Sequence, residues 1–139
     1  MRGLPSLIKM RGLQLDEKRR KLAELERMRA ALIERREAID AEIAKEKASA
    51  EAKPETQADF GAFLQGALKR RATLERSIAD VERLSEAAND EVAEAYRELK
   101  KFELVKQRED ADALLEGNRR EQSQLDEIGL NNFLRRGRE

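Results

Sequence analysis

A recurrence of apolar residues every three or four positions constrains this chain more than any other feature of its sequence. The stretch AKPETQAD divides the recurrence into two arrays. Eight of thirteen core positions of a heptad register are apolar between residues 8 and 50, and eleven of fifteen are apolar between residues 64 and 113. A sustained repeat of this kind presses one face of a helix against a partner helix. The sequence therefore predicts two long helices that pack along a shared seam.

The two registers assign the seam residues. In the first, the a positions are Ile8, Leu15, Leu22, Arg29, Arg36, Ile43 and Ala50, and the d positions are Arg11, Lys18, Leu25, Leu32, Ile39 and Glu46. In the second, the a positions are Leu64, Arg71, Ile78, Ser85, Val92, Leu99, Lys106 and Ala113, and the d positions are Ala67, Leu74, Val81, Ala88, Ala95, Phe102 and Glu109.

The break between the arrays indicates a bend. Pro54 has no amide hydrogen and disfavours helical geometry at Lys53 before it. Thr56 followed by Asp59 is typical of a capping box that opens a new helix. We expect helix one over about residues 6–52, a turn over 53–58 and helix two over about 59–134, all within one coiled-coil domain of residues 1–139.

So short a turn joins neighbouring helix ends, and the helices must therefore run antiparallel. The expected fold is all-α, an antiparallel two-helix coiled-coil hairpin with a longer C-terminal helix. A turn centred near residue 56 places Ile8 opposite roughly Leu104, and helix two then has no partner further on. There are 14 basic and 10 acidic side chains in residues 1–53, against 8 and 11 in residues 54–105. These opposite net charges favour a monomeric hairpin over self-pairing of either helix, although exposed pairs contribute only ~0–1 kcal/mol each.

Composition narrows the class of protein. Charged residues make up 42% of the chain and aromatic residues 4%, which is typical of long helices or of a disordered chain. The zero net charge and regular apolar spacing favour helices. No run approaches the ~20 apolar residues that span a bilayer, and the N-terminus lacks the apolar stretch of a secretory signal. A cytoplasmic location is compatible with the absence of cysteine.

The residue types argue against an enzyme. Histidine and cysteine are absent, so the commonest general base and the commonest nucleophile–base pairs are missing. The carboxylates alternate with lysine and arginine on outward faces, and no glycine-rich phosphate loop occurs. We expect no catalytic activity, no cofactor and no metal.

Two clusters are candidate partner-binding residues. Phe60, Phe63 and Leu64 open helix two beside the bend, where they cap the hairpin or form an exposed hot spot for a partner. The basic run at residues 18–21 contributes Lys18, Arg19 and Arg20. This run has three interpretations: a solvated helix face, a contact for an acidic protein surface, or a nucleic-acid contact. The nucleic-acid contact is the least favoured, because acidic residues flank the run.

The tail, REQSQLDEIGLNNFLRRGRE, is the third candidate. Its apolar residues, which include Leu125, Ile128 and Phe133, do not extend the earlier seam. Gly117 and Gly129 each cost about 1 kcal/mol in a helix interior. An unpartnered apolar stripe indicates a docking surface that orders against a partner, whereas the alternative is a frayed, solvated terminus.

Two segments carry a resemblance. FGAFLQGALKRR, with Phe63, Leu64 and Gln65 in matching places, resembles the aromatic-rich stretch that follows the turn in the flagellar FliJ family. LLEGNRREQSQLDEIGL resembles that family's ending: an N-R, a short polar stretch and a D-E pair. The size, the two-helix rod and the basic finish are also similar.

The resemblance implies a soluble component of flagellar type III export that resembles the central stalk of rotary ATPases. Its implied partners are the export ATPase ring near the termini, the export gate protein FlhA on the flank near the bend, and export chaperones. The implied location is cytoplasmic, peripheral at the inner-membrane export apparatus. Two rival classes are a generic structural coiled coil, including type III secretion relatives of the same shape, and a basic-helix nucleic-acid binder.

Overall fold

The computed structural model describes residues 2–138, which form two long helices joined by one helical turn. The elements are α1 (Leu4–Ala52), the 3-10 turn η1 (Pro54–Thr56) and α2 (Gln57–Gly137), with no strand among the described residues. The predicted all-α, two-helix fold is confirmed. Helix α1 begins two residues earlier than expected because a proline in the first turn, here Pro5, needs no intrahelical amide partner.

Contacts divide the chain into two compact units. The hairpin unit holds Leu13–Tyr96 and includes the bend. The arm unit holds the first turns of α1, through Gly12, together with α2 from Arg97 onward. Each unit is described by itself below.

The bend forms where the sequence predicts it. Lys53 is extended, with φ −131° and ψ 93°, as expected for a residue before proline. Its carbonyl oxygen accepts hydrogen bonds from the Thr56 amide at 3.0 Å and from the Thr56 hydroxyl at 2.7 Å. The capping-box interpretation of Thr56 is wrong. Thr56 is the last residue of the 3-10 turn η1, and its hydroxyl donates backward to the Lys53 carbonyl instead of capping the start of α2.

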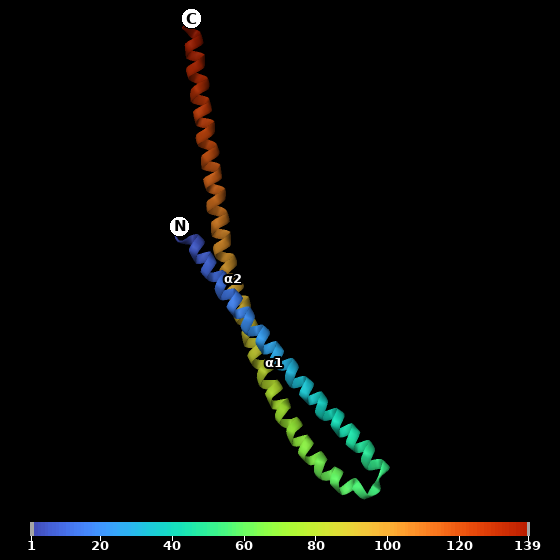
Figure 1. The fold of residues 1–139 in the computed structure, drawn as a ribbon. Helices are drawn as coiled ribbons and strands as arrows, with labels where there is room; N and C mark the ends of the chain where they lie inside the picture. Colours follow the sequence, from blue (N-terminus) through green and yellow to red (C-terminus); the bar gives the residue numbers. More distant parts are fainter. Residues whose placement is uncertain (1, 139) are drawn as a thin grey trace. The chain divides into compact units, whose positions relative to one another are not determined.

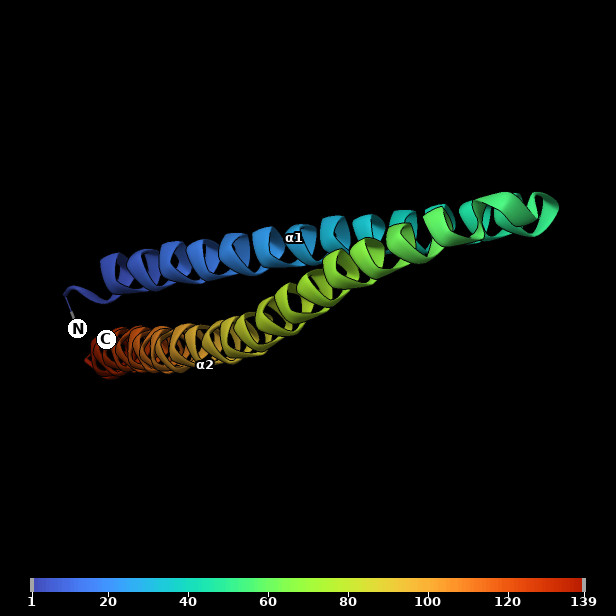
Figure 2. The ribbon, with the colours of Figure 1, turned by 90° about the horizontal axis from the view of Figure 1, so that it is seen from below.

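In the hairpin unit, α1 and α2 lie side by side and antiparallel (Figures 1 and 2). Pairs such as Arg29–Glu82 and Arg36–Glu75 join the helices, and the residue number falls in α2 as it rises in α1. The buried seam residues are few and mostly small: Leu15, Ala50, Ala67, Ile78, Val81 and Ala88. Most other apolar seam residues, including Leu32 and Leu74, are half-buried. The seam is thus thin, and the ion pairs at its edges favour this pairing without deciding it.

In the arm unit, the start of α1 packs on one stretch of α2. Leu4 is only 1% exposed, and Ile8 is half-buried. The Arg11 guanidinium lies 5.7 Å from the centre of the Phe102 ring, a cation–π distance. From Gln107 through Gly137 every residue of α2 is exposed. The seam therefore ends close to the residue at which the sequence predicts that the partner helix runs out.

The accessible surface of the chain is large. It amounts to 11278 Å², whereas a compact globular protein of 15.9 kDa exposes about 7,400 Å². No helix within residues 2–138 is long enough and apolar enough to cross a membrane.

Candidate functional site

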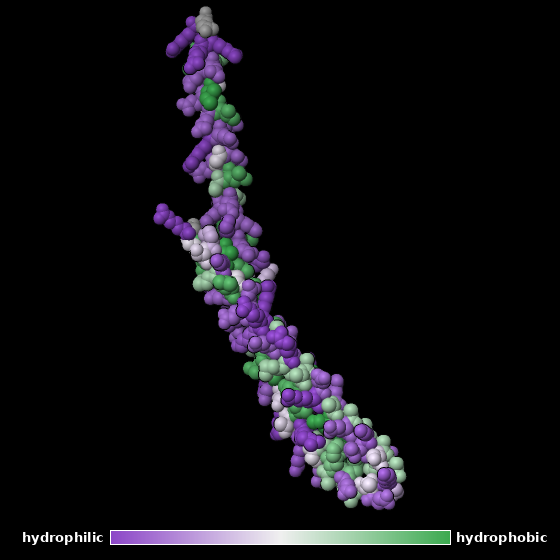
Figure 3. Space-filling view, viewed as in Figure 1, coloured by the Kyte–Doolittle hydropathy of each residue, from purple (hydrophilic) through white to green (hydrophobic). Residues whose placement is uncertain are grey.

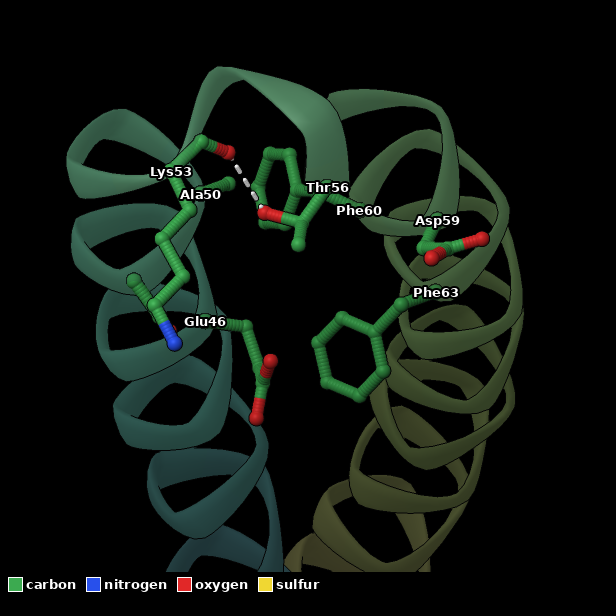
Figure 4. Close-up of a pocket in the computed structure, with 8 residues that line it drawn as sticks. Glu46, Ala50, Lys53, Thr56, Asp59, Phe60 and Phe63 are labelled. Atoms are coloured by element: carbon green, nitrogen blue, oxygen red, sulfur yellow. Dashed lines mark hydrogen bonds between the residues drawn. The ribbon is translucent and has the colours of Figure 1, made fainter.

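The bend contains a cavity between the two helices of the hairpin unit. It measures about 360 Å³ and is lined by Glu46, Ser49, Ala50, Lys53, Thr56, Asp59, Phe60 and Phe63. The rings of Phe60 and Phe63 lie in the space between the helices, and Glu46 reaches toward Phe63 from α1 (Figure 4). Leu64, the third residue predicted here, is half-buried at its seam position and does not line the cavity.

The cavity exists because the seam cannot close beside the bend. Glu46 occupies a d position, and burying its carboxylate without a partner would cost several kcal/mol. Ala50, one turn on, is buried but too small to fill the space. Two half-buried aromatic rings therefore keep accessible faces. The glutamate at a core position was the sequence signal for this opening.

The cavity offers a mixed chemical surface. The rings of Phe60 and Phe63 form an apolar wall, and aromatic side chains of this kind are enriched in the centres of protein interfaces. Glu46, Asp59 and Lys53 are the charged residues that line it. The described residues contain no cluster of three or more His, Cys, Asp or Glu side chains that could hold a metal ion. The arrangement suits an apolar anchor from a protein partner.

The predicted basic run is divided by the fold. Lys18 turns toward α2, and its Nζ lies 3.3 Å from Glu91 Oε2. Lys21 Nζ lies 3.9 Å from the same oxygen. Arg19 and Arg20 are exposed. Lys18 thus contributes to helix pairing, while the two arginines face outward.

The arm of α2, defined as residues 107–137, is a single helix with its apolar side chains in solvent. Phe133 is 72% exposed, Leu125 61% and Ile128 56%. Apolar patches stand separated on an otherwise hydrophilic surface along this segment (Figure 3). The helix passes through Gly117 and Gly129 without interruption. These three predicted partner-binding residues are therefore available to a partner.

Local ion pairs support the arm. Arg120 pairs with Glu116 at 2.9 Å, four residues away. At the foot of the arm, Lys106 Nζ lies 2.9 Å from Asp110. This hydrogen bond raises the pKa of Lys106 above its usual value of 10.5. Pairs at this spacing stabilise an isolated helix slightly. They involve none of the apolar side chains of the arm, which stay exposed.

The shortest interhelical ion pair among the described residues joins Asp40 of α1 to Arg71 of α2 in the hairpin unit. Arg71 Nε donates to Asp40 Oδ1 at 2.7 Å. This hydrogen bond lowers the pKa of Asp40 below its usual 3.8 and raises the pKa of Arg71. Both groups stay charged at neutral pH, and their attraction adds a modest preference for this register.

A groove on one flank of the hairpin unit was not foreseen from the sequence. Its volume is about 440 Å³, and it is lined by Arg35, Ala38, Ile39, Glu42, Arg70 and Leu74. The only sequence signal is the spacing of these residues beside the seam.

Comparison with known proteins decides the family. The model of the FliJ family, described as flagellar FliJ protein, matches residues 1–138. The chain belongs to the FliJ family. The flagellar FliJ protein of Caulobacter vibrioides strain NA1000 / CB15N is 29% identical over 125 residues, which cover 90% of each chain. The FliJ protein of strain ATCC 19089 / CIP 103742 / CB 15 gives the same figures. No solved structure matches the chain.

Membership of the FliJ family makes this chain a component of the flagellar export apparatus. The match extends over the bend and the arm alike, so both predicted contact regions lie within the part that FliJ proteins share. The bend cavity and the exposed arm are the candidate contact sites of this FliJ-family chain.

Proposed function

We propose that this FliJ-family chain links the export ATPase ring to the export gate protein FlhA in the manner of a rotary stalk, and that it also escorts export chaperones. It acts through protein contacts, without catalysis or a cofactor, in the cytoplasm at the inner-membrane export apparatus. The observation that carries the proposal is the exposed arm: a 31-residue stretch of α2 after Lys106 keeps all its apolar side chains in solvent.

The arm is the proposed contact for the ATPase and the chaperones. Leu125, Ile128 and Phe133 supply apolar area, and Arg135 and Arg136 lie in the last turn of α2. Arginines at that end complement the negative pole of the helix and steer the arm toward acidic surfaces. Association should therefore weaken as salt is added. The exposed Arg19 and Arg20 on α1 would meet acidic protein surfaces by the same physics.

The bend is the proposed contact for the gate. Phe60 and Phe63 present ring faces in the cavity, and Leu64 continues the apolar surface into the seam. A partner residue that fills the cavity would gain about 25 cal/mol for each Å² of apolar surface removed from water. Filling it would also brace the helices where the seam is open.

The test uses two variants that should separate the partners. A chain that ends at residue 118 lacks Leu125, Ile128 and Phe133 but retains the entire hairpin unit. We expect it to keep its helical hairpin and gate binding while losing the ATPase and the chaperones. Phe63→Ala should do the converse, with helicity intact. The purified partners would be titrated against each variant by calorimetry.

Two outcomes would contradict the proposal. If the chain ending at 118 binds the ATPase and the chaperones with unchanged affinity, the arm is only a solvated end. If Phe63→Ala loses helicity in parallel with gate binding, the phenylalanine caps the hairpin and the gate contact lies elsewhere.

Two other functions make distinct predictions. A structural coiled coil that dimerises through whole helices would give twice the monomer mass in light scattering, whereas the proposed chain is a monomer. A nucleic-acid binder acting through Arg19 and Arg20 would bind duplex DNA with an affinity that falls steeply with salt. The proposal expects no such binding at physiological salt.

A further inference from the structure

The seam of the hairpin unit pairs unlike residues. The ion pair of Arg36 with Glu75 and its neighbours along the seam indicate the register, in which each a residue of one helix faces a d residue of the other. In this register Leu32 faces Ile78, and this layer alone joins two large apolar side chains between residues 13 and 96. Every other layer there sets a large apolar side chain against a charged residue, a serine or an alanine. The observed register is therefore a poor match of apolar residues.

A second register would pair like with like. If α1 is moved by one heptad along α2, away from the bend, a residues again face d residues. The displacement is about 10 Å along the helix. Three layers of the hairpin unit then join two large apolar side chains: Ile43–Leu74, Ile39–Ile78 and Leu25–Val92. By apolar pairing alone, this displaced register matches the two helices better than the observed one.

The displaced register also supplies new partners for seam arginines. Arg36 then meets Glu82, and Arg71 meets Glu46. Glu46 holds the observed seam open beside the bend, whereas in the displaced register its carboxylate faces a guanidinium. Interhelical ion pairs of this exposed kind contribute little each, and both registers offer them. Charge therefore does not exclude the displaced register.

Moving α1 by one heptad in the opposite direction, toward the bend, is less favourable. Large apolar layers would form there too, but Arg36 would meet Leu68 and Arg71 would meet Ile33, so both arginines would lose their carboxylates. The end of α1, where Ala50 is buried, would also have to unwind. The two directions are thus distinct, and the seam offers one favourable alternative.

The bend decides between the observed and the displaced register. The displaced register needs a connection seven residues longer, which the first turns of α2, residues 57–63, would supply by unwinding. These turns are weakly held, because Phe60 and Phe63 line the open cavity (Figure 4) and Gly61 is a poor helix former. The short bend at Pro54 favours the observed register, while the apolar seam favours the displaced one.

We propose that the hairpin unit is a two-register switch, in which α1 slides by one heptad along α2 when the first turns of α2 unwind. One layer of a coiled coil cannot move alone, because each side chain sits between neighbours of the facing helix. The slide therefore carries a change at the bend to the other end of the hairpin unit. Filling the bend cavity would hold the observed register, since Phe60 and Phe63 leave their helical turns in the displaced one. The switch is a property of the hairpin unit and does not rest on which protein binds the bend or the arm.

The switch is tested by disulfide trapping in the full chain, which has no cysteine of its own. Every variant carries Ser85→Cys, at a site whose hydroxyl is buried without a hydrogen-bond partner among the described residues. Residue 85 faces Leu25 in the observed register, Leu32 in the displaced register and Lys18 in the opposite one. Under mild oxidation of dilute protein, Leu25→Cys should cross-link to residue 85 fast, and Leu32→Cys more slowly but to completion. Lys18→Cys is the matched control, as far from Leu25 as Leu32 is, and it should cross-link least.

Two glycine variants connect the slide to the bend. Gly61→Ala strengthens a turn that must unwind, so it should slow the cross-link between residues 32 and 85 by about fivefold, as the helix propensities of glycine and alanine imply. Gly66→Ala is the matched control and should leave this rate unchanged, because residue 66 lies beyond the turns that unwind. At both positions an added Cβ meets nothing within 4 Å. Mass spectrometry of the single chain gives the extent of cross-linking, and circular dichroism confirms that each variant retains its helices.

Three results would overturn the proposal. The first is the absence of a cross-link between residues 32 and 85. The second is an equal rate for the Leu32→Cys and Lys18→Cys variants, which fraying helices would give. The third is equal slowing by Gly61→Ala and Gly66→Ala, which would mean that the cross-link forms through general unfolding and not through a slide that starts at the bend.

Discussion

Replacing Ile78 by alanine tests the thin seam most directly. Ile78 is 4% exposed at an a position of α2, and it is among the largest of the buried side chains in the hairpin unit. Large-to-alanine changes in well-packed cores cost about 2–5 kcal/mol, and the cost grows with the cavity that remains. Here most seam neighbours are half-buried, so the two helices can close part of the gap. We therefore expect about 2 kcal/mol, at the low end of that range.

Leu84→Ala is the matched control for this prediction. Leu84 lies six residues further along the same helix but is 56% exposed, and its truncation should change the free energy of unfolding by less than about 0.5 kcal/mol. Urea unfolding followed by circular dichroism gives both values. At about 4 °C for each kcal/mol in a chain of this size, the melting temperature should fall by about 8 °C for Ile78→Ala alone. If the two variants lose equal stability, Ile78 does not lie in the seam and the register is wrong.

Three further predictions follow from the structure. Gly117→Ala and Gly129→Ala should raise helix stability by about 1 kcal/mol each, since an added Cβ would meet nothing within 4 Å at either position. Slower amide exchange along the arm would show this gain in stability. Unchanged exchange would mean that the arm is not helical in solution. Arg71 lowers the pKa of Asp40. The contribution of the Asp40 carboxylate to stability is therefore fully present above the usual carboxyl pKa, and it is lost as the pH falls through the lowered pKa of the folded state. Asp40→Asn should then be destabilising at pH 7 but not in strong acid, and a pH-independent difference between the two urea midpoints would count against the ion pair. The third prediction concerns hydrogen exchange, measured for the free chain and for its complex with the ATPase. Amides beyond about residue 110 should exchange fast in the free chain and become protected in the complex. Equal protection in both states would place the contact outside the arm.

Features that depend on local chemistry or on one-dimensional spacing could be predicted from the sequence. The bend follows from Pro54, which forces Lys53 out of helical geometry whatever surrounds it. The extent of the seam follows from counting heptads outward from that bend, because helix pairing conserves register. Both need only the order of residues along the chain.

Features that depend on side-chain direction could not be predicted in this way. The heptad letters place Arg29, Arg36 and Arg71 at the seam. They do not say that all three side chains turn to the same flank of the seam, where each pairs with a carboxylate of the opposite helix. The Thr56 hydroxyl had two possible partners, an amide at the start of α2 and the carbonyl of Lys53, and within the 3-10 turn it donates to the carbonyl. The predicted roles of Phe60, Phe63, Leu64 and the arm residues stay predictions until their partners are tested.

The large exposed surface of the chain has a thermal consequence. An unfolded chain of 15.9 kDa exposes about 23,000 Å². Folding to 11278 Å² therefore buries about 12,000 Å², against about 16,000 Å² for a compact globule. The heat capacity of unfolding follows buried apolar area, and it should be about a quarter smaller here. A smaller heat capacity flattens the curve of stability against temperature. The helices should hold a small but nearly even free energy of unfolding across a wide thermal range, so that warming and cooling alter their pairing less than they would alter a denser fold.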